Sequence, residues 1–394
     1  MTIITVTGEI SSDQTGMMLT HEHILSDLTC YIDPDGFSDE ETKIDLSNLW
    51  DLKYGGVGNK DTLVLQDIDD AIYEVNLYKK AGGDIFVDLT PDGIGRNPKG
   101  LETISKRTGV KIIAGSGYYV GLSHPAYIKK WSVERVKEEI VKDLTVGIGD
   151  TGIRAGIIGE IGAADSKPTA EETKTIEAAG LAQIETGAGI IVHCRGLGRF
   201  NSPDEPMKIL EKSGADLNKV GIAHRDSQLS KLKREDYLRH YGKIIDKGAY
   251  VCFDCFGHTG YSWTPDWKIN KVNIPEKNSS TPVIGTEEYF NNKDWETVPY
   301  KHTDRRRYDW VPFYVIESDI ERVEGIMNMI EGGYIKNLLL SHDVCSKLHY
   351  RKYGGQGLGH IYETIIPMLR EAGITQRQID IILKENPRRL ISIK

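Results

Sequence analysis

Short apolar runs alternate along this chain with longer segments in which apolar and charged residues recur at helical spacing. Strands that alternate with helices predict a parallel sheet, and continuous apolar runs are typical of strands buried on both faces. Eight repeats of this unit predict an α/β fold, a single (β/α)8 TIM barrel over residues 1–394. The eight apolar runs are residues 16–23, 84–90, 110–115, 153–162, 189–194, 220–226, 249–254 and 337–343.

One long segment interrupts this alternation. Residues 255–312 follow the seventh run and are rich in Trp, Tyr, Pro, Asn and charged residues. A connection of this length is usually functional or disordered, and its many aromatic residues argue against disorder. We interpret it as an insertion after strand seven that folds over the barrel mouth. Packing against the outside of the barrel is the alternative.

Composition and charge exclude several classes of protein. The formal net charge of −9 argues against binding to nucleic acid. No apolar run reaches about 18 residues, so no contact with a membrane is expected, and the N-terminus lacks the pattern of a secretory signal. The five cysteines are scattered, which is typical of a reduced, cytoplasmic protein. Cys252 and Cys255 form an isolated CxxC pair, which gives little support to a zinc or redox role.

Six residues with metal-binding side chains lie at or near the carboxyl ends of the predicted strands. His21 and His23 end the first strand, and both imidazoles can face one ion because alternate residues of a strand point to the same side. Barrel enzymes place their active sites at this end. A lone histidine is more often a hydrogen-bonded core residue, but six such residues in this arrangement predict a metal centre. The other four are Glu160, His193, His224 and Asp343.

Four imidazoles and two carboxylates suit two divalent metal ions, with zinc favoured and manganese or cobalt as alternatives. Glu160 has two oxygens and can bridge the ions, and two adjacent ions can share a hydroxide and polarise a carbonyl. Asp343 is the predicted catalytic residue, which ligates one ion and takes the proton of the attacking water.

The motifs around these residues resemble those of the phosphotriesterase family in the amidohydrolase superfamily. The resemblance implies a (β/α)8 barrel with a binuclear metal centre, in which a bridging hydroxide attacks the substrate. By this resemblance, the buried metal is bound by His21, His23 and Asp343, and the more exposed metal by His193 and His224. Relatives are often dimers, so the resemblance also allows a homodimer. The matching motifs are THEH, VDLTPDGIGRNP, GIRAGIIGEIG, VHC, GIAHRD, LLLSHD and ENPRRLI.

The fourth strand departs from the best-known phosphotriesterases, which bridge their metals with a carboxylated lysine. Here Gly159 takes the place of that lysine and Glu160 follows it, which resembles some phosphotriesterase homology proteins. Glu160 needs no carbon dioxide to act as a bridge. The departure therefore weakens an assignment of phosphotriesterase activity but not the metal centre.

Basic and aromatic residues near the strand ends indicate an anionic small-molecule substrate. Lys347 and Arg351 lie in the loop after the eighth strand. Arg195 and Arg225 follow two of the candidate metal ligands, and Tyr118 follows the third strand. Arg side chains bind phosphate and carboxylate well because their planar forks match these groups. A solvated or structural charge is the alternative for each of these residues.

We therefore expect a metal-dependent hydrolase, and we favour a lactonase or esterase. Its substrate would be a small lactone or ester with a phosphate or carboxylate, such as a phosphorylated sugar lactone. An amide hydrolase of a small N-acyl compound and a promiscuous phosphotriesterase are the alternatives among enzymes. A noncatalytic barrel that binds a metabolite is a more remote alternative, because it would be expected to lack one or more of the metal ligands.

Overall fold

The computed structural model describes residues 1–32, 38–39, 42–54, 58–164, 167–194, 203–226, 234–258, 261–262, 314–315 and 317–393. Eight parallel strands form one sheet in the order β16-β13-β12-β11-β10-β9-β8-β3. Each strand lies at a predicted apolar run. The strands are β3 (Met18–Glu22), β8 (Ile85–Asp88), β9 (Lys111–Ser116), β10 (Ile157–Ala163), β11 (Ile190–Cys194), β12 (Val220–Ile222), β13 (Tyr250–Phe253) and β16 (Leu338–Leu340).

The first and last strands of this order meet and close the sheet into a barrel. The Asp343 N–H donates to the His21 carbonyl at 3.0 Å, and the His23 N–H donates to the Val344 carbonyl at 2.9 Å. The structure thus confirms the predicted (β/α)8 fold. The barrel interior is apolar and includes Met18, Val87, Ile113, Ile191 and Leu339.

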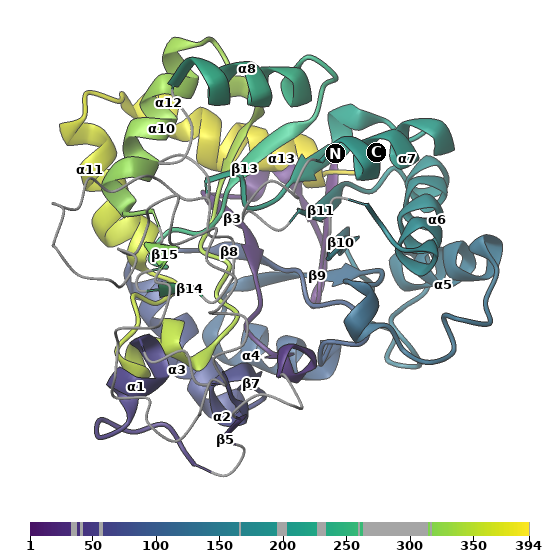
Figure 1. Ribbon diagram of the computed structural model, residues 1–394, viewed down its shortest axis with the longest axis horizontal. Helices are drawn as coiled ribbons and strands as arrows, with labels where there is room; N and C mark the ends of the chain where they lie inside the picture. The colour runs from purple at the N-terminus through teal and green to yellow at the C-terminus, as the bar shows by residue number, and fades with distance from the viewer. Residues whose placement is uncertain are drawn as a thin grey trace, which may run out of the picture.

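Helices surround these strands (Figure 1). In α5 (Val133–Thr145) the buried residues Val136, Ile140 and Leu144 recur every four positions, which gives the helix one apolar face against the barrel. Ser132 begins this helix by accepting a hydrogen bond from the Arg135 N–H at 3.2 Å. The other long helices among the described residues are α3 (Ile68–Lys80), α4 (Pro98–Thr108), α6 (Ala170–Thr186), α7 (Asp204–Ser213), α8 (Arg234–Ile245) and α10 (Asp319–Glu331).

Both ends of the chain pack together (Figure 1). The Thr2 N–H donates to the Ile393 carbonyl at 2.9 Å. The hairpin of β1 (Thr2–Thr5) and β2 (Gly8–Ser11) therefore lies beside the last helical segment. That segment consists of η11 (Ile361–Ile365), α11 (Ile366–Glu371), α12 (Gln376–Asp380), η12 (Ile381–Glu385) and α13 (Asn386–Ile391).

The connection from β3 to α3 builds a small subdomain beside the carboxyl end of the barrel. Its short strands form two ribbons, β4 (Ser26–Asp27) with β7 (Val64–Leu65), and β5 (Ser38–Asp39) with β6 (Gly58–Asn59). Two short helices complete it, α1 (Leu49–Tyr54) and α2 (Lys60–Leu63).

Most of the predicted insertion, residues 255–312, lies outside the described residues. Its beginning is tied to the segment that follows it, because β14 (Tyr261–Ser262) pairs with β15 (Tyr314–Val315). Its role over the barrel mouth stays a prediction. Within the described part of the chain, no helix is both long and apolar enough to cross a membrane.

Candidate metal centre

The six predicted metal-binding side chains converge at the carboxyl end of the barrel. They lie in or directly after β3, in β10 and β11, and two or three residues after the ends of β12 and β16. Five of them are buried, and the carboxylate of Asp343 is the most accessible, with 14% of its side chain exposed. The shared strand end brings these residues together, because the carboxyl ends of parallel strands lie at one end of a barrel.

Glu160 lies at the middle of this group. Its Oε2 atom is 3.4 Å from His21 Nε2 and 3.6 Å from His23 Nε2. Its Oε1 atom is 2.8 Å from His193 Nδ1 and 3.1 Å from His224 Nε2. Each carboxylate oxygen therefore faces a different pair of imidazoles, which is the arrangement that a bridging ligand requires.

Asp343 lies beside the first pair of imidazoles, those of His21 and His23. Its Oδ1 atom lies 3.3 Å from His23 Nε2 and 3.7 Å from His21 Nε2. These three residues can offer ligand atoms that all lie within 4.8 Å of one another. One group thus consists of His21, His23 and Asp343, the other of His193 and His224, and Glu160 belongs to both.

Two of these residues have strained backbones. His224 has a φ of 58° and Asp343 a φ of 53°, and they are the non-glycine residues with positive φ in the described part of the chain. A non-glycine residue in this left-handed region costs on the order of 1–3 kcal/mol, so the surrounding structure must hold it there. Strain of this kind is concentrated at functional sites.

Electrostatics link the carboxylates and the imidazoles of this cluster. Burial acts to raise the pKa of Glu160, but His193 and His21 hold that pKa well below its usual range. Burial likewise acts to lower the pKa of His23, but hydrogen bonds with Asp343 and Glu160 raise it to about 9. The buried carboxylates are therefore anions that require positive charge beside them, which protons or metal ions can supply.

Asp254 is a functional residue that the sequence analysis missed. It directly follows β13, and its fully buried carboxylate touches both groups. Its Oδ2 atom is 2.7 Å from His21 Nδ1, and its Oδ1 atom is 3.1 Å from His224 Nδ1 and accepts the His224 N–H at 2.7 Å. Burial acts to raise the pKa of Asp254, but His224 and His21 lower it below its usual range.

Through these hydrogen bonds Asp254 fixes the orientation of one imidazole in each group. A carboxylate that accepts from Nδ1–H leaves Nε2 free to bind a metal. Thr90 has a similar position beside His23, with Oγ1 3.1 Å from Nδ1. The signal for Asp254 was present in the sequence, since it is the carboxylate at the end of the seventh apolar run.

Tyr119, and not its neighbour Tyr118, faces the cluster. Its hydroxyl lies 3.2 Å from His193 Nδ1 and accepts a hydrogen bond from the Tyr31 hydroxyl at 2.9 Å. Tyr118, the predicted substrate contact, packs its ring against His124 and Tyr127. Adjacent residues after a strand point in different directions, and the sequence does not show which one faces the site.

The predicted basic contacts have different surroundings. Arg225 is buried, and its guanidinium donates to the main-chain carbonyls of Ala223 and Cys194. The Arg351 guanidinium donates to Glu363 and to the Gln356 carbonyl.

Lys347 donates to Asp61 Oδ1 at 2.7 Å. The remaining predicted contact, Arg195, lies outside the described residues. A substrate role for these side chains stays a prediction.

The cluster fits two divalent cations. Neutral imidazoles and carboxylates are a donor set that zinc, manganese and cobalt accept. Glu160 offers one oxygen to each group, and the Asp254 carboxylate can accept the Nδ1 protons of His21 and His224, which leaves the Nε2 atoms of both rings for a metal.

Comparison with known proteins places the chain in a family. The model of the phosphotriesterase family matches residues 1–277 and 305–391. The chain belongs to the phosphotriesterase family. Members of this family use a binuclear metal centre, and this member is a hydrolase like its relatives.

Three similar proteins span nearly the whole chain. N-acetyltaurine hydrolase of Danio rerio is 32% identical over 99% of this chain and 97% of its own length. The crystal structure of a resiniferatoxin-binding protein from Rhodobacter sphaeroides is 29% identical, with a TM-score of 0.80 over 99% of this chain and 95% of that one. A lactonase from Listeria monocytogenes shares the fold, with 20% identity and a TM-score of 0.68 over 100% of both chains.

Proposed function

We propose that this family member is a binuclear metal-dependent amidohydrolase that cleaves a small N-acyl compound carrying an anionic group. The observation that carries the proposal is the position of Glu160, whose two oxygens face different histidine pairs at 2.8–3.6 Å. In this proposal His21, His23 and Asp343 would hold one cation, His193 and His224 would hold the other, and Glu160 would contribute to both. When bound, the two cations would supply a hydroxide at neutral pH and polarise the substrate carbonyl.

Asp343 is the proposed proton carrier. It is the most accessible carboxylate of the cluster, and its Oδ1 atom lies 3.3 Å from His23 Nε2. This position allows it to accept the proton of the attacking water and to deliver it to the leaving group. An amide needs this transfer more than an ester does, because the amine must be protonated as it leaves.

The choice of an N-acyl substrate rests on the full-length relative. The N-acetyltaurine hydrolase of Danio rerio matches 99% of this chain, and N-acetyltaurine is an anionic amide. This relative favours the amide alternative over the lactonase that the sequence analysis put first. The lactonase assignment stays a prediction, since the Listeria monocytogenes lactonase supports a common fold alone at 20% identity.

The test is a hydrolysis screen with enzyme loaded in turn with zinc, manganese and cobalt. N-acetyltaurine, a panel of N-acetyl amino acids, and sugar lactones with and without a phosphate are offered at equal concentrations. We expect turnover of the anionic N-acyl compounds, with the metal content near two ions per chain by plasma mass spectrometry. Turnover of lactones alone would contradict the substrate class. A protein that retains no metal would contradict the binuclear centre and would favour the noncatalytic barrel.

A further inference from the structure

The residue between the two histidines of β3 has a different set of contacts from its neighbours. Alternate residues of a strand point to opposite faces, so the Glu22 side chain leaves the side on which His21 and His23 meet the metal centre. It is fully buried where β3 and β16 come together and close the barrel. Among the described residues, the partners of its carboxylate lie between positions 341 and 344.

Glu22 accepts four hydrogen bonds from the segment that contains Asp343. Its Oε1 atom accepts the Ser341 hydroxyl at 2.8 Å and the His342 N–H at 3.0 Å, and lies 2.9 Å from His342 Nδ1. Its Oε2 atom accepts the Val344 N–H at 2.9 Å. One carboxylate therefore binds both the residue before Asp343 and the residue after it.

The peptide group between Asp343 and Val344 is held at both of its polar atoms. Its N–H donates to Glu22 Oε2, and its carbonyl oxygen accepts a hydrogen bond from His258 Nε2 at 3.0 Å. On the preceding side, the Asp343 N–H donates to the His21 carbonyl at 3.0 Å. The planes of the two peptide groups that flank Asp343 are thus fixed by hydrogen bonds, and these planes set its φ and ψ angles.

These bonds act on a residue that would otherwise relax. Asp343 has a φ of 53°, and a residue other than glycine stays in this left-handed region only when its surroundings hold it there. The backbone angles set the direction of the side chain. In the present conformation Oδ1 lies 3.3 Å from His23 Nε2 and 3.7 Å from His21 Nε2, whereas Oδ2 lies 3.9 Å from His224 Nδ1.

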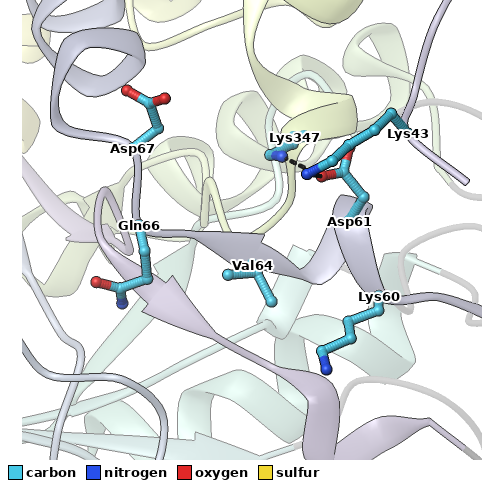
Figure 2. A pocket seen from close by; sticks show the side chains of 7 residues that line it. All are labelled: Lys43, Lys60, Asp61, Val64, Gln66, Asp67 and Lys347. Atoms are coloured by element: carbon cyan, nitrogen blue, oxygen red, sulfur yellow. Dashed lines mark hydrogen bonds and ion pairs between the residues drawn. The ribbon is translucent and has the colours of Figure 1, made fainter. Parts of the chain in front are cut away.

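The loop that follows β16 has anchors of its own. Lys347 donates to Asp61 Oδ1 at 2.7 Å (Figure 2). Farther along, the Arg351 N–H donates to the buried carboxylate of Glu74 at 3.0 Å. These contacts would keep the loop in place without Glu22, so the loss of Glu22 Oε2 would be felt mainly at the peptide group before the loop.

We propose that Glu22 is a positioning residue that holds Asp343 in the orientation required for metal binding and proton transfer. Its Oε2 atom acts on Asp343 through the Val344 N–H, while its Oε1 atom joins β3 to the end of β16. This assignment rests on the proposed function, in which Asp343 is a metal ligand and the proton carrier. It adds a residue that supports both roles through the backbone of Asp343.

Glu22→Gln tests the Oε2 contact with little change in side-chain volume. The amide keeps one acceptor oxygen, which we expect to remain on the side of the Oε1 donors, and its NH2 group then faces the Val344 N–H. Two donors cannot share a hydrogen bond, so the peptide group after Asp343 is released. We expect the affinity for one of the two metal ions to fall about 10- to 100-fold, measured by chelator competition.

Two substrates then separate proton transfer from a general loss of folded enzyme, at metal concentrations that saturate both sites. N-acetyltaurine releases an amine that must be protonated, whereas 4-nitrophenyl acetate releases 4-nitrophenolate, which leaves as an anion. In Glu22→Gln we expect kcat to fall roughly tenfold more for the amide than for the ester, with little change in KM, because a misplacement of about 1 Å can cost about 100-fold in rate. Unchanged metal affinity with an equal fall of kcat for both substrates would overturn the assignment.

Glu74→Gln is the matched control. Glu74 is also a fully buried glutamate, and it accepts the N–H groups of Arg351 and Leu358 in the same loop, both at 3.0 Å. Its replacement removes a comparable hydrogen bond and should lower the urea midpoint by a similar amount. It should leave the metal affinity and the ratio of the two kcat values unchanged. Equal losses of metal affinity in Glu22→Gln and Glu74→Gln would overturn the assignment.

A second variant reaches the same peptide group from its other side. His258→Phe removes the hydrogen bond to the Asp343 carbonyl and retains a ring that can stack on His349. We expect the same selective loss of metal affinity, and a double variant with Glu22→Gln should lose little more than either single one. If Glu22→Gln does not fold, His258→Phe decides the question, and normal metal affinity in it would overturn the assignment.

Metal affinity separates this assignment from the proposed function, because it is measured without a substrate. A selective loss of affinity in Glu22→Gln, in a protein that cleaves no N-acyl compound, would support the role of Glu22 and contradict the proposed function. Full metal affinity and full N-acetyltaurine hydrolysis in Glu22→Gln would support the function and overturn the role of Glu22. A wild-type protein that binds no metal would contradict both.

Discussion

Replacement of Asp254 by asparagine should remove one metal ion in preference to the other. The two side chains have nearly the same shape, but an amide has one acceptor oxygen and one donor nitrogen. The His224 N–H donates to Asp254 Oδ1 at 2.7 Å, so the amide oxygen should remain on that side. The amide nitrogen would then face His21 Nδ1, which lies 2.7 Å from the present Oδ2 atom.

This exchange reverses the tautomer of His21. An amide nitrogen donates to Nδ1, so the imidazole proton moves to Nε2, the atom that faces Glu160 and Asp343. A protonated Nε2 cannot bind a metal. The first site would lose a ligand, whereas His224 would keep an acceptor beside its Nδ1–H.

The magnitude follows from the contact that is lost. A hydrogen bond to a buried charged group contributes about 1.5–3 kcal/mol, and loss of such a partner typically lowers metal affinity about 10- to 100-fold. We expect the metal content of Asp254→Asn to fall from two ions towards one per chain after dialysis against a weak chelator. The hydrolytic rate should fall with it.

The assay is plasma mass spectrometry on dialysed protein, with chelator competition to obtain the two dissociation constants. Thr90→Val is the matched control, because it removes a neutral hydrogen bond to His23 of 3.1 Å and leaves the charge unchanged. Its effect on affinity should be smaller, about 2- to 10-fold. Two tightly held ions in Asp254→Asn, or a larger loss in Thr90→Val, would refute the tautomer argument.

Three further substitutions test the site and its support. Glu160→Ala should lose most of the metal and most of the activity, and near-normal metal content would contradict its bridging role. Gly162→Ala should reduce metal binding at His193, because an added Cβ would lie 2.5 Å from the His193 Cβ, and unchanged metal content would contradict this contact. Asp226→Ala should lower the free energy of unfolding by about 1.5–3 kcal/mol in urea, since it removes the charged hydrogen bond to the buried Arg322 guanidinium at 3.0 Å and leaves Asp319 as the remaining carboxylate there. A loss below about 1 kcal/mol would show that this buried pair contributes little.

The regular part of the fold could be predicted from the order of apolar and polar residues. All eight apolar runs form barrel strands, because a mainly apolar run of six to ten residues between amphipathic helices has few other ways to be buried. The convergence of His21, Glu160, His224 and Asp343 could be predicted for the same reason. Because the strands are parallel, their carboxyl ends all lie at the same end of the barrel.

The contacts that orient those side chains could not be predicted. Asp254 reaches His21 across 233 positions of sequence, and this pairing depends on the closed barrel. Tyr119 rather than Tyr118 faces His193 because of the path of the loop after β9.

The sequence by itself determined the barrel and the set of candidate ligands, because both follow from local periodicity and chain order. The tertiary structure decided which partners the basic side chains form hydrogen bonds and ion pairs with. Arg225 donates to main-chain carbonyls, Arg351 to Glu363 and Lys347 to Asp61. A charge in the sequence is compatible with all of these positions. Its partner is selected by distance and burial, which exist only after the chain has folded.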